Sequence, residues 1–343
     1  MGFTKADAVT DQPGKLDKTT PITVSPSTKP QIRRSAEESI TAGLQWIAMA
    51  AAKGGRWTDF TMLDRGSDVW VTAHVLARLG ELPLDCVPPS LQQHIEAALN
   101  WLEKQRTSGA GWSSASREPD AFTTSWAVLA LRGHGRGVPR SAIDFLLSCR
   151  HSNGGFSVYA NSADSRGTHL PSTAEITVTA LRSLSMCDSA AEEFLASRLR
   201  TELPGMASGL LPRLYACAEI LDWENGLAPW ALLNRAGQCT AQFDLEKPYE
   251  QALLLRSLLR LRNQRAWPIS ATLRNMQLAD GSWPAGTVVG PITQFSTAAN
   301  SLSFGDTRVI STANVVAALV MNEAQPGLYY GSDVPLPRKL RES

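Results

Sequence analysis

The sequence is poor in the residues that build metal and redox sites. Its 343 residues include five cysteines and five histidines, with no Cys-x-x-Cys pair and no His-Glu-x-x-His segment. Zinc sites need three or four such ligands at compact or convergent positions. We therefore expect no metal ion and no cofactor. The scattered, odd-numbered cysteines are typical of small core residues in a reducing compartment, which predicts a cytoplasmic protein.

Excess charge and long hydrophobic runs are also missing. The 33 basic and 32 acidic residues give a net charge of +1, without a basic stripe, so we expect no nucleic-acid partner. No run reaches the roughly 18 apolar residues of a membrane-spanning helix, although a peripheral contact with a membrane surface stays open. The hydrophobic content of 43% is ample for a globular core.

Composition divides the chain into three parts. Residues 1–34 are rich in Thr, Lys, Pro and Ser and lack an apolar stretch, which predicts a disordered arm rather than a signal peptide. Residues 35–325 carry regular hydrophobic patterns and are expected to form one domain. Residues 326–343, with the segment Pro335–Arg341, are expected to be a surface tail.

One pattern occurs four times in the central part. Each copy is an apolar helix, a glycine turn and an aromatic residue, followed by a second helical segment that opens on a hydroxyl and a small residue. The aromatic residues are Trp57, Trp112, Phe156 and Trp283, and the openings are Thr72-Ala73, Thr124-Ser125, Thr173-Ala174 and Thr312-Ala313. The threonines are 52, 49 and 139 residues apart, and the last step is close to three of the others. Two degenerate copies are therefore expected, around Leu214–Ala218 and Tyr249–Ala252.

The repeats predict an all-α fold. Apolar residues recur at helical spacing after Val69 and after Ile176, and strand alternation is scarce. A helix pair cannot bury its own apolar face, so several pairs must close around a shared core. We predict an α/α barrel, or toroid, of five to six helix pairs, with the four turn aromatics as packing wedges.

The turn sequence resembles a known repeat. Trp101 to Gln105, followed by Gly111-Trp112, resembles the glutamine-tryptophan (QW) repeat of squalene and hopene cyclases and related class II terpene cyclases. Gln277 to Trp283 is a second match. The resemblance covers residues 35–325 and implies the α/α-barrel superfamily of the prenyltransferase and squalene oxidase repeat, which also includes prenyltransferase β subunits. Such a subunit would need Asp, Cys and His converging on zinc, and no such set lies in register.

The resemblance also implies where a catalytic acid would lie. Class II cyclases carry an Asp-x-Asp-Asp-Thr-Ala motif at the start of a barrel helix, and its middle Asp protonates the substrate. Here the corresponding windows begin at Asp68, Asp120, His169 and Arg308, and none has the middle acid. We therefore name Asp120, Asp68 and His169 as catalytic candidates. Since Asp is a common N-cap, a capping role for Asp68 and Asp120 is the alternative.

Nearby residues suggest a substrate site. A carboxyl group that protonates an alkene must be held neutral near pH 7, and the resulting cation is stabilised by aromatic faces. Aromatic residues lie close to both aspartates in the sequence, Glu175 follows Thr173, and Arg308 opens the fourth window. The predicted substrate-binding residues are Trp70, Phe122, Trp126, Glu175 and Arg308.

Two functions follow from these expectations. The first is an atypical class II terpene-cyclase-like enzyme, a cyclase or isomerase of natural-product biosynthesis. It would promote acid-initiated or shape-directed ring closure of an apolar, isoprenoid-like chain in the barrel cavity. The second is a non-catalytic barrel that binds a small molecule or a protein and has lost the acid. No Asp-rich Mg²⁺ motif is present, which disfavours ionisation of a diphosphate.

Overall fold

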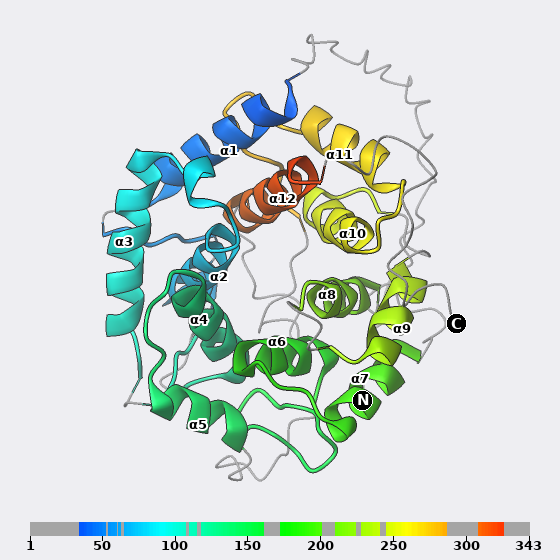
Figure 1. Cartoon of the computed structure of the whole chain (residues 1–343). Helices are drawn as coiled ribbons and strands as arrows, with labels where there is room; N and C mark the ends of the chain where they lie inside the picture. Colours follow the sequence, from blue (N-terminus) through cyan, green and yellow to red (C-terminus); the bar gives the residue numbers. More distant parts are fainter. Residues whose placement is uncertain are drawn as a thin grey trace, which may run out of the picture. The chain divides into compact units, whose positions relative to one another are not determined.

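The computed structural model describes residues 34–52, 54–59, 61–62, 65–107, 110–114, 118–160, 172–200, 210–223, 228–240, 245–286 and 308–325. These residues belong to one compact unit, Arg33–Ser343. They form twelve α-helices in two concentric layers (Figure 1). A short 3₁₀ helix, Leu84–Cys86, and a two-stranded antiparallel hairpin, β1 (Thr61–Met62) and β2 (Arg65–Gly66), complete the described elements.

The inner layer is a closed ring of six helices. Each inner helix packs against the next, and the last, α12, packs against the first, α2. The inner helices are α2 (Asp68–Leu79), α4 (Ala121–Gly133), α6 (Ala174–Leu184), α8 (Leu210–Leu221), α10 (Pro248–Arg260) and α12 (Arg308–Glu323). The two degenerate copies expected around residues 214–218 and 249–252 are α8 and α10.

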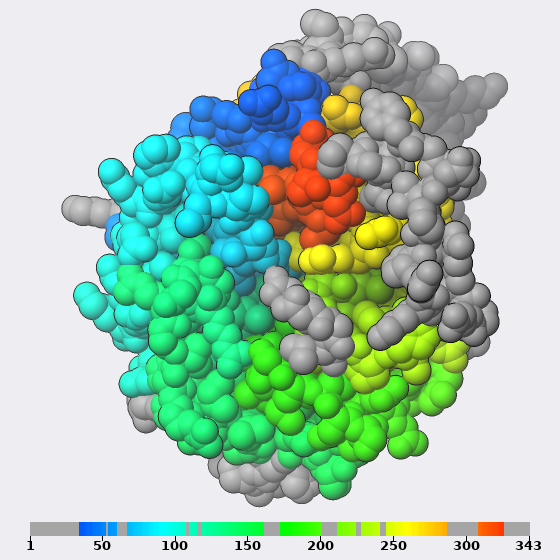
Figure 2. Space-filling model, viewed as in Figure 1, coloured from blue at the N-terminus to red at the C-terminus, as the bar shows by residue number. Residues whose placement is uncertain are grey.

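The outer layer supplies one helix to each inner helix. The outer helices are α1 (Ala36–Ala50), α3 (Pro89–Lys104), α5 (Arg140–Ser148), α7 (Ser189–Arg200), α9 (Trp230–Thr240) and α11 (Ala266–Asn275). Figure 2 shows the same arrangement as packed atoms, with α12 between α1 and α10. The structure confirms the predicted all-α barrel, with six helix pairs among the described residues.

The glycine turns join the two layers through their aromatic residues. The indole N–H groups of Trp57, Trp112 and Trp283 donate to carbonyl oxygens near the ends of α1, α3 and α11, at 2.9, 2.7 and 2.6 Å. The backbone amides of the same tryptophans donate to Oγ1 of Thr72, Thr124 and Thr312 on the inner helices. Each tryptophan is fully buried, and one residue thus satisfies an outer helix terminus through its indole N–H and fixes an inner helix through its backbone amide.

The third copy has a different register from the one expected. The backbone amide of Phe156 donates to Oγ1 of Thr177, at 2.9 Å, and not to Thr173. Thr173 is the N-cap of α6 instead. Thr173 and Thr177 are one helical turn apart, so both fit the same apolar periodicity. The window beginning at His169 is therefore wrong, and the equivalent window is Thr173–Val178.

Other predictions lie at or beyond the limits of the described residues. The predicted arm, residues 1–34, is described only at Arg34, whose guanidinium donates to carbonyl oxygens of Leu278 and Ala279. The predicted tail lies wholly outside, so the division of the chain stays a prediction. Among the helices that the structure describes, none is both long and apolar enough to cross a membrane.

Candidate functional site

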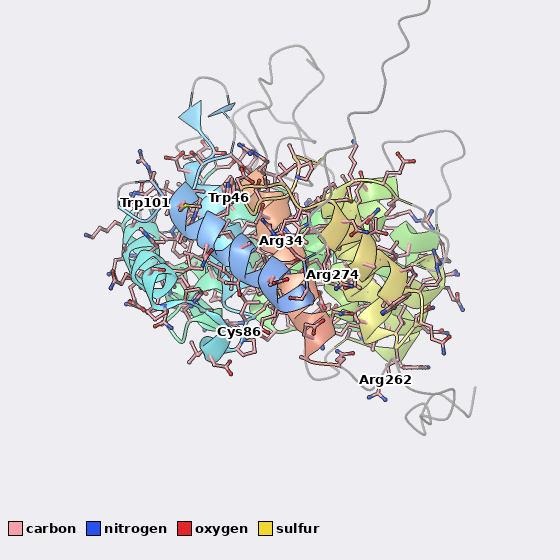
Figure 3. The ribbon with its side chains drawn as sticks, turned by 90° about the horizontal axis from the view of Figure 1, so that it is seen from above. Arg34, Trp46, Cys86, Trp101, Arg262 and Arg274 are labelled. Carbon is pink, nitrogen blue, oxygen red and sulfur yellow. The ribbon has the colours of Figure 1, made fainter. Side chains whose placement is uncertain are left out.

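The six inner helices run in the same direction, which divides the barrel interior into two halves. Cys86 and Arg262 follow the C-terminal ends of α2 and α10, and Figure 3 shows both at the same end of the ring. The β1–β2 hairpin, which precedes α2, lies at the other end (Figure 3). Residues early in the inner helices therefore share one half of the interior, and residues late in them share the other.

The inward face of each inner helix follows from its contact with the outer layer. Thr72 and Thr124 bond the turn tryptophans and so face outward. Residues two positions away lie on the opposite side of a helix with 3.6 residues per turn. Trp70, His74 and Arg78 accordingly form one inward stripe on α2, at four-residue spacing.

Aromatic rings fill the half at the N-terminal ends of the inner helices. Trp70 lies 6.1 Å from Phe122 and 6.1 Å from the imidazole of His74, measured between ring centroids. Phe122 lies 6.4 Å from Trp126 and 6.2 Å from Tyr215, and His74 lies 4.1 Å from Trp126. We call these five residues the aromatic cluster. All five are buried, and they come from α2, α4 and α8.

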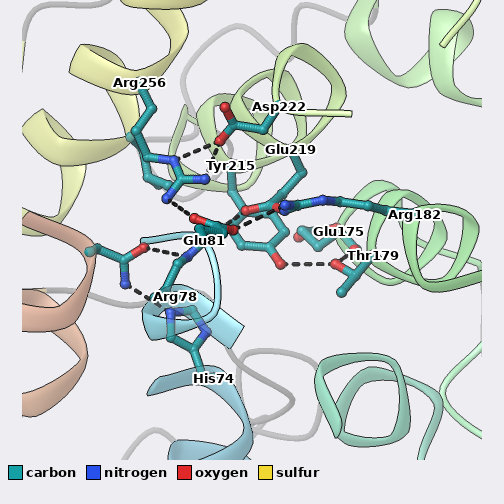
Figure 4. Close-up of polar contacts among 12 residues, drawn as sticks. His74, Arg78, Glu81, Glu175, Thr179, Arg182, Tyr215, Glu219, Asp222 and Arg256 are labelled. Carbon is teal, nitrogen blue, oxygen red and sulfur yellow. Dashed lines mark hydrogen bonds and ion pairs between the residues drawn. The ribbon is translucent and has the colours of Figure 1, made fainter. Parts of the chain in front are cut away.

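Ion pairs fill the other half (Figure 4). Glu81 accepts from Arg78, Arg256 and Arg182 at 2.8, 2.8 and 3.0 Å. Glu219 pairs with Arg78 and Arg182, and Asp222 pairs with Arg256 and, at 3.0 Å, with Arg260. We call these four arginines and three acids the ion network. The network thus has one more arginine than it has acids. The partial negative charge at the C-terminal ends of the inner helices stabilises this excess positive charge.

In the ion network, burial and ion pairing shift the pKa values of the carboxyl groups in opposite directions. Burial raises the pKa of Glu81, but Arg256, Arg78 and Arg182 more than offset it, so that this pKa lies well below its ordinary value. The pKa of Glu219 is also lowered, since Arg78, Arg182 and Arg256 together outweigh its burial. Both carboxyl groups are therefore ionised at neutral pH and unsuited to protonating a substrate.

Asp120 lies at the N-cap of α4. Its Oδ1 accepts from the backbone amide of Thr123 at 2.7 Å, and its Oδ2 accepts from that of Ser114 at 2.9 Å. Burial raises its pKa, while these two hydrogen bonds act in the opposite direction. The structure gives Asp120 a capping position next to Phe122, and its predicted catalytic role stays a prediction.

The other predicted acids and the predicted cation lie elsewhere. Asp68 is in the first turn of α2, where its carboxylate lies 3.3 Å from Nε of Arg56. Arg308 is partly exposed, lies 3.1 Å from the Asp280 carboxylate and stacks on Trp46 of α1. Arg308 thus faces the outer layer and not the aromatic cluster. His169 lies outside the described residues.

Glu175 lies in the first turn of α6 on the inward face. It is four residues before Thr179, whose Oγ1 lies 2.8 Å from the hydroxyl oxygen of Tyr215 in the aromatic cluster (Figure 4). Burial raises the pKa of Glu175, against hydrogen bonds to its own backbone amide and to Thr173. In the corrected register, Glu175 is the third residue of the window Thr173–Val178, the place of the middle acid in the motif that the sequence resembles.

Some residues of this interior could be recognised from the sequence alone. Trp70, Phe122 and Trp126 were predicted and lie together, and Glu219 stands in an apolar segment where a charge requires a partner. The partners of Glu219 come from α2 and α6, and no local pattern identifies them. Within the described residues, no three His, Cys, Asp or Glu side chains form a group that could hold a metal ion.

Comparison with known proteins is informative at the level of structure. No family model and no curated protein matches the sequence. A protein from Actinoplanes is 19% identical over 84% of this chain and 100% of its own, with a TM-score of 0.65. The type II terpene cyclase MstE from Scytonema is 18% identical over 84% of this chain and 99% of its own, with a TM-score of 0.63.

A variant of MstE has been solved with its substrate, geranylgeranyl dihydroxybenzoate. That structure is 18% identical over 83% of this chain and 97% of its own, with a TM-score of 0.61. Identities this low establish the fold and leave the chemistry to the site. Together with the closed ring of six helix pairs, these likenesses show that the chain has the α/α-barrel fold of the type II terpene cyclases.

Proposed function

We propose that this protein is an atypical terpene-cyclase-like enzyme that binds an apolar, isoprenoid-like chain in the aromatic half of its barrel. It promotes acid-initiated or shape-directed ring closure of that chain. The observation that carries the proposal is the buried aromatic cluster together with the inward-facing carboxyl group of Glu175 on the neighbouring helix α6, whose pKa is raised by burial. The similar cyclase MstE binds a geranylgeranyl compound, which supports a prenyl chain as the ligand class.

Glu175 is the proton donor that the geometry supports best. Its burial favours the neutral acid, which is the form that can protonate an alkene. Its position one turn from Thr179 directs it toward Tyr215 and the aromatic cluster. Proton transfer to an alkene carbon leaves a carboxylate and a carbocation, and the ring faces of Trp70 and Phe122 stabilise that cation electrostatically.

Asp120 is the second candidate acid. It is buried beside Phe122 and its pKa is also raised. Both of its oxygens already accept backbone N–H groups, which stabilises the carboxylate and gives the side chain a structural role at the start of α4. Asp68, paired with Arg56 near the rim, is the weaker candidate.

A non-catalytic binding barrel is the alternative function. The third position of the motif is apolar in three of the four corresponding helices, where it is Trp70, Phe122 and Ile310. The ion network moreover fixes one half of the interior in a single arrangement, as a rigid binding scaffold requires.

Product formation separates the two functions. The full-length protein is incubated with geranylgeranyl dihydroxybenzoate and with acyclic prenyl alcohols of different lengths, and products are identified by mass spectrometry and NMR. The enzyme yields cyclic isomers of the same mass. Glu175→Gln is expected to lower the rate by roughly 10²- to 10⁴-fold. Glu250→Gln, a matched change in the first turn of α10, should leave the rate unchanged.

Binding without turnover would support the alternative. If Glu175→Gln keeps the full rate of a cyclisation that the wild type performs, the acid assignment is wrong and Asp120 becomes the next candidate. Absence of both binding and turnover with every prenyl compound would contradict the proposed ligand class.

A further inference from the structure

The side-chain amide of Asn314 has a fixed orientation. Its Oδ1 accepts from Nε of Arg78 at 3.0 Å, and its Nδ2 donates to the carbonyl oxygen of Ile310 at 2.9 Å. Arg78 carries only donors and is held by Glu219 and Glu81, so Oδ1 must face it. In the flipped orientation, Oδ1 would face the carbonyl oxygen of Ile310 and Nδ2–H would face the Nε–H of Arg78, and both contacts would be repulsive.

This orientation determines the tautomer of His74. Nδ2 of Asn314 lies 2.8 Å from Nε2 of His74, and because Nδ2 can only donate, Nε2 must accept. A neutral imidazole that accepts at Nε2 carries its proton on Nδ1. Burial and the nearby Arg78 guanidinium lower the pKa of His74 well below its ordinary value, which agrees with the neutral form. His74 therefore presents an Nδ1–H donor.

That donor has no acceptor within the described structure. His74 is fully buried, and its Nδ1 makes no hydrogen bond. The neighbouring Trp126, with its ring centroid 4.1 Å away, is also fully buried, and its Nε1–H is likewise without an acceptor. Two donors cannot satisfy each other. A buried donor left without an acceptor carries a desolvation cost that native interiors normally avoid.

We propose that His74 Nδ1–H and Trp126 Nε1–H bind a neutral oxygen acceptor of the ligand, such as the carbonyl oxygen of an ester or ketone. The inference rests on the proposed function for the apolar chain and adds that this chain bears an oxygen function. A neutral acceptor fits better than a carboxylate, because the arginines nearest this site are already paired with Glu81 and Glu219. His74 acts here as a donor and not as a base, since its one lone pair on nitrogen faces Asn314.

A matched pair of probes tests this proposal on the full-length protein. One probe is geranylgeranyl acetate, which carries an ester carbonyl, and the other is the acyclic hydrocarbon with the same isoprenoid skeleton and no oxygen. Binding is measured by tryptophan fluorescence. Protein labelled with ¹⁵N at histidine and tryptophan reports the two N–H groups by NMR, and spectra of His74→Phe and Trp126→Phe assign the signals.

The acetate is expected to bind about 10- to 100-fold more tightly than the hydrocarbon, as one or two buried hydrogen bonds would give. It should shift the His74 Nδ1–H and Trp126 Nε1–H signals, which the hydrocarbon should not. Trp126→Phe keeps an aromatic ring but removes the indole N–H, so it should reduce the difference in affinity between the acetate and the hydrocarbon. If His74→Phe does not fold, the wild-type spectra and Trp126→Phe decide.

Three results would overturn the proposal, and they are distinguishable. If both probes bind equally and neither signal moves, the donors bind water only, while the proposed binding of an apolar chain stands. If neither probe binds, the ligand class of the proposed function fails and this inference fails with it. A spectrum showing the Nε2–H tautomer of His74 in the free protein would also overturn the proposal, because Nδ1 would then have no proton to donate.

Discussion

The two halves of the barrel interior differ in how their buried polar groups are paired. We call the half that holds the ion network the charged half, and the half that holds the aromatic cluster the aromatic half. In the ion network, every carboxylate accepts from at least two arginines. In the aromatic cluster, His74 and Trp126 each keep a buried N–H that finds no acceptor among the described residues. Buried charges persist when they are paired, and unpaired donors persist where something else supplies the acceptor. We therefore propose that the charged half holds the ring together and that the aromatic half receives a ligand.

Disruption of the ion network in the charged half should cause the largest loss of stability. Glu219→Gln removes the charge that pairs with the fully buried Arg78 and with Arg182, whose side chain is 11% exposed. We expect a loss of about 3–5 kcal/mol in the free energy of unfolding, measured by urea denaturation. The control is Glu96→Gln on the surface, whose pair with Arg136 at 2.5 Å is exposed, and it should cost about 0–1 kcal/mol. Equal losses in both variants would mean that the network is not a stabilising unit.

The second-largest loss of stability is expected at acidic pH and arises in the charged half. The pKa values of Glu81 and Glu219 are lowered in the fold, so these groups contribute stability above the ordinary glutamate pKa and lose it as the pH falls through their folded values. The raised pKa of Glu175 has the opposite sign, because its protonation favours the fold. Urea denaturation across acidic pH should show a decline in stability that is shallower in Glu219→Gln than in the wild type. A steeper decline in that variant would contradict the assignment.

A smaller effect is expected at the start of α4, on the border of the aromatic half. Asp120→Ala removes the acceptor for Thr123 and Ser114 and should cost about 1 kcal/mol of stability. Asp120→Asn keeps one acceptor oxygen for Thr123 and should lose less. Thermal denaturation gives the stability, and turnover measured on the same samples gives the role. A rate that falls in Asp120→Asn while stability is retained would restore Asp120 as the acid.

The smallest effect is expected within the aromatic cluster itself. Trp126→Phe removes a buried N–H that has no acceptor in the described part of the chain, so the relief of its desolvation cost offsets part of the lost ring area. Stability of the ligand-free protein should change by about 1 kcal/mol or less, far below the change in Glu219→Gln. A loss as large as in Glu219→Gln would show that the Trp126 ring, which also stacks on Arg78 at 4.8 Å, belongs to the structural half.

The barrel was predictable because its turns carry a local signal. A glycine followed by a buried tryptophan links the layers at Trp57, Trp112 and Trp283, and each link lies within one repeat. The register of the third copy was not predictable, because Thr173 and Thr177 occupy the same helical face one turn apart. For this reason the sequence alone predicts substrate binding for Glu175 and not the middle acid position.

The composition of the interior was predictable only in part. Trp70 and Phe122 lie together because equivalent positions of parallel helices meet at one level of the ring, and Trp126 follows Phe122 one turn later on α4. Arg308 occupies the same register position as Asp68 and Asp120, but its side chain pairs with Asp280 and stacks on Trp46 in the outer layer. The Arg78–Glu219 pair joins residues 141 positions apart and requires the closed ring before it exists.

Closure between α2 and α12 also has consequences for the order of folding. Hydrogen bonds from Arg78 to Asn314 and from Gln277 to Ser39 span 236 and 238 positions, and the amide of Ile310 reaches Asp59 across 251. During synthesis on the ribosome, the first five helix pairs have emerged before α12 exists, so they form an open arc with apolar edges. Contacts of such long sequence separation form slowly, and the arc is the stage at which aggregation competes with folding. Chaperone dependence of this chain should therefore concentrate in the interval before its last helix is made.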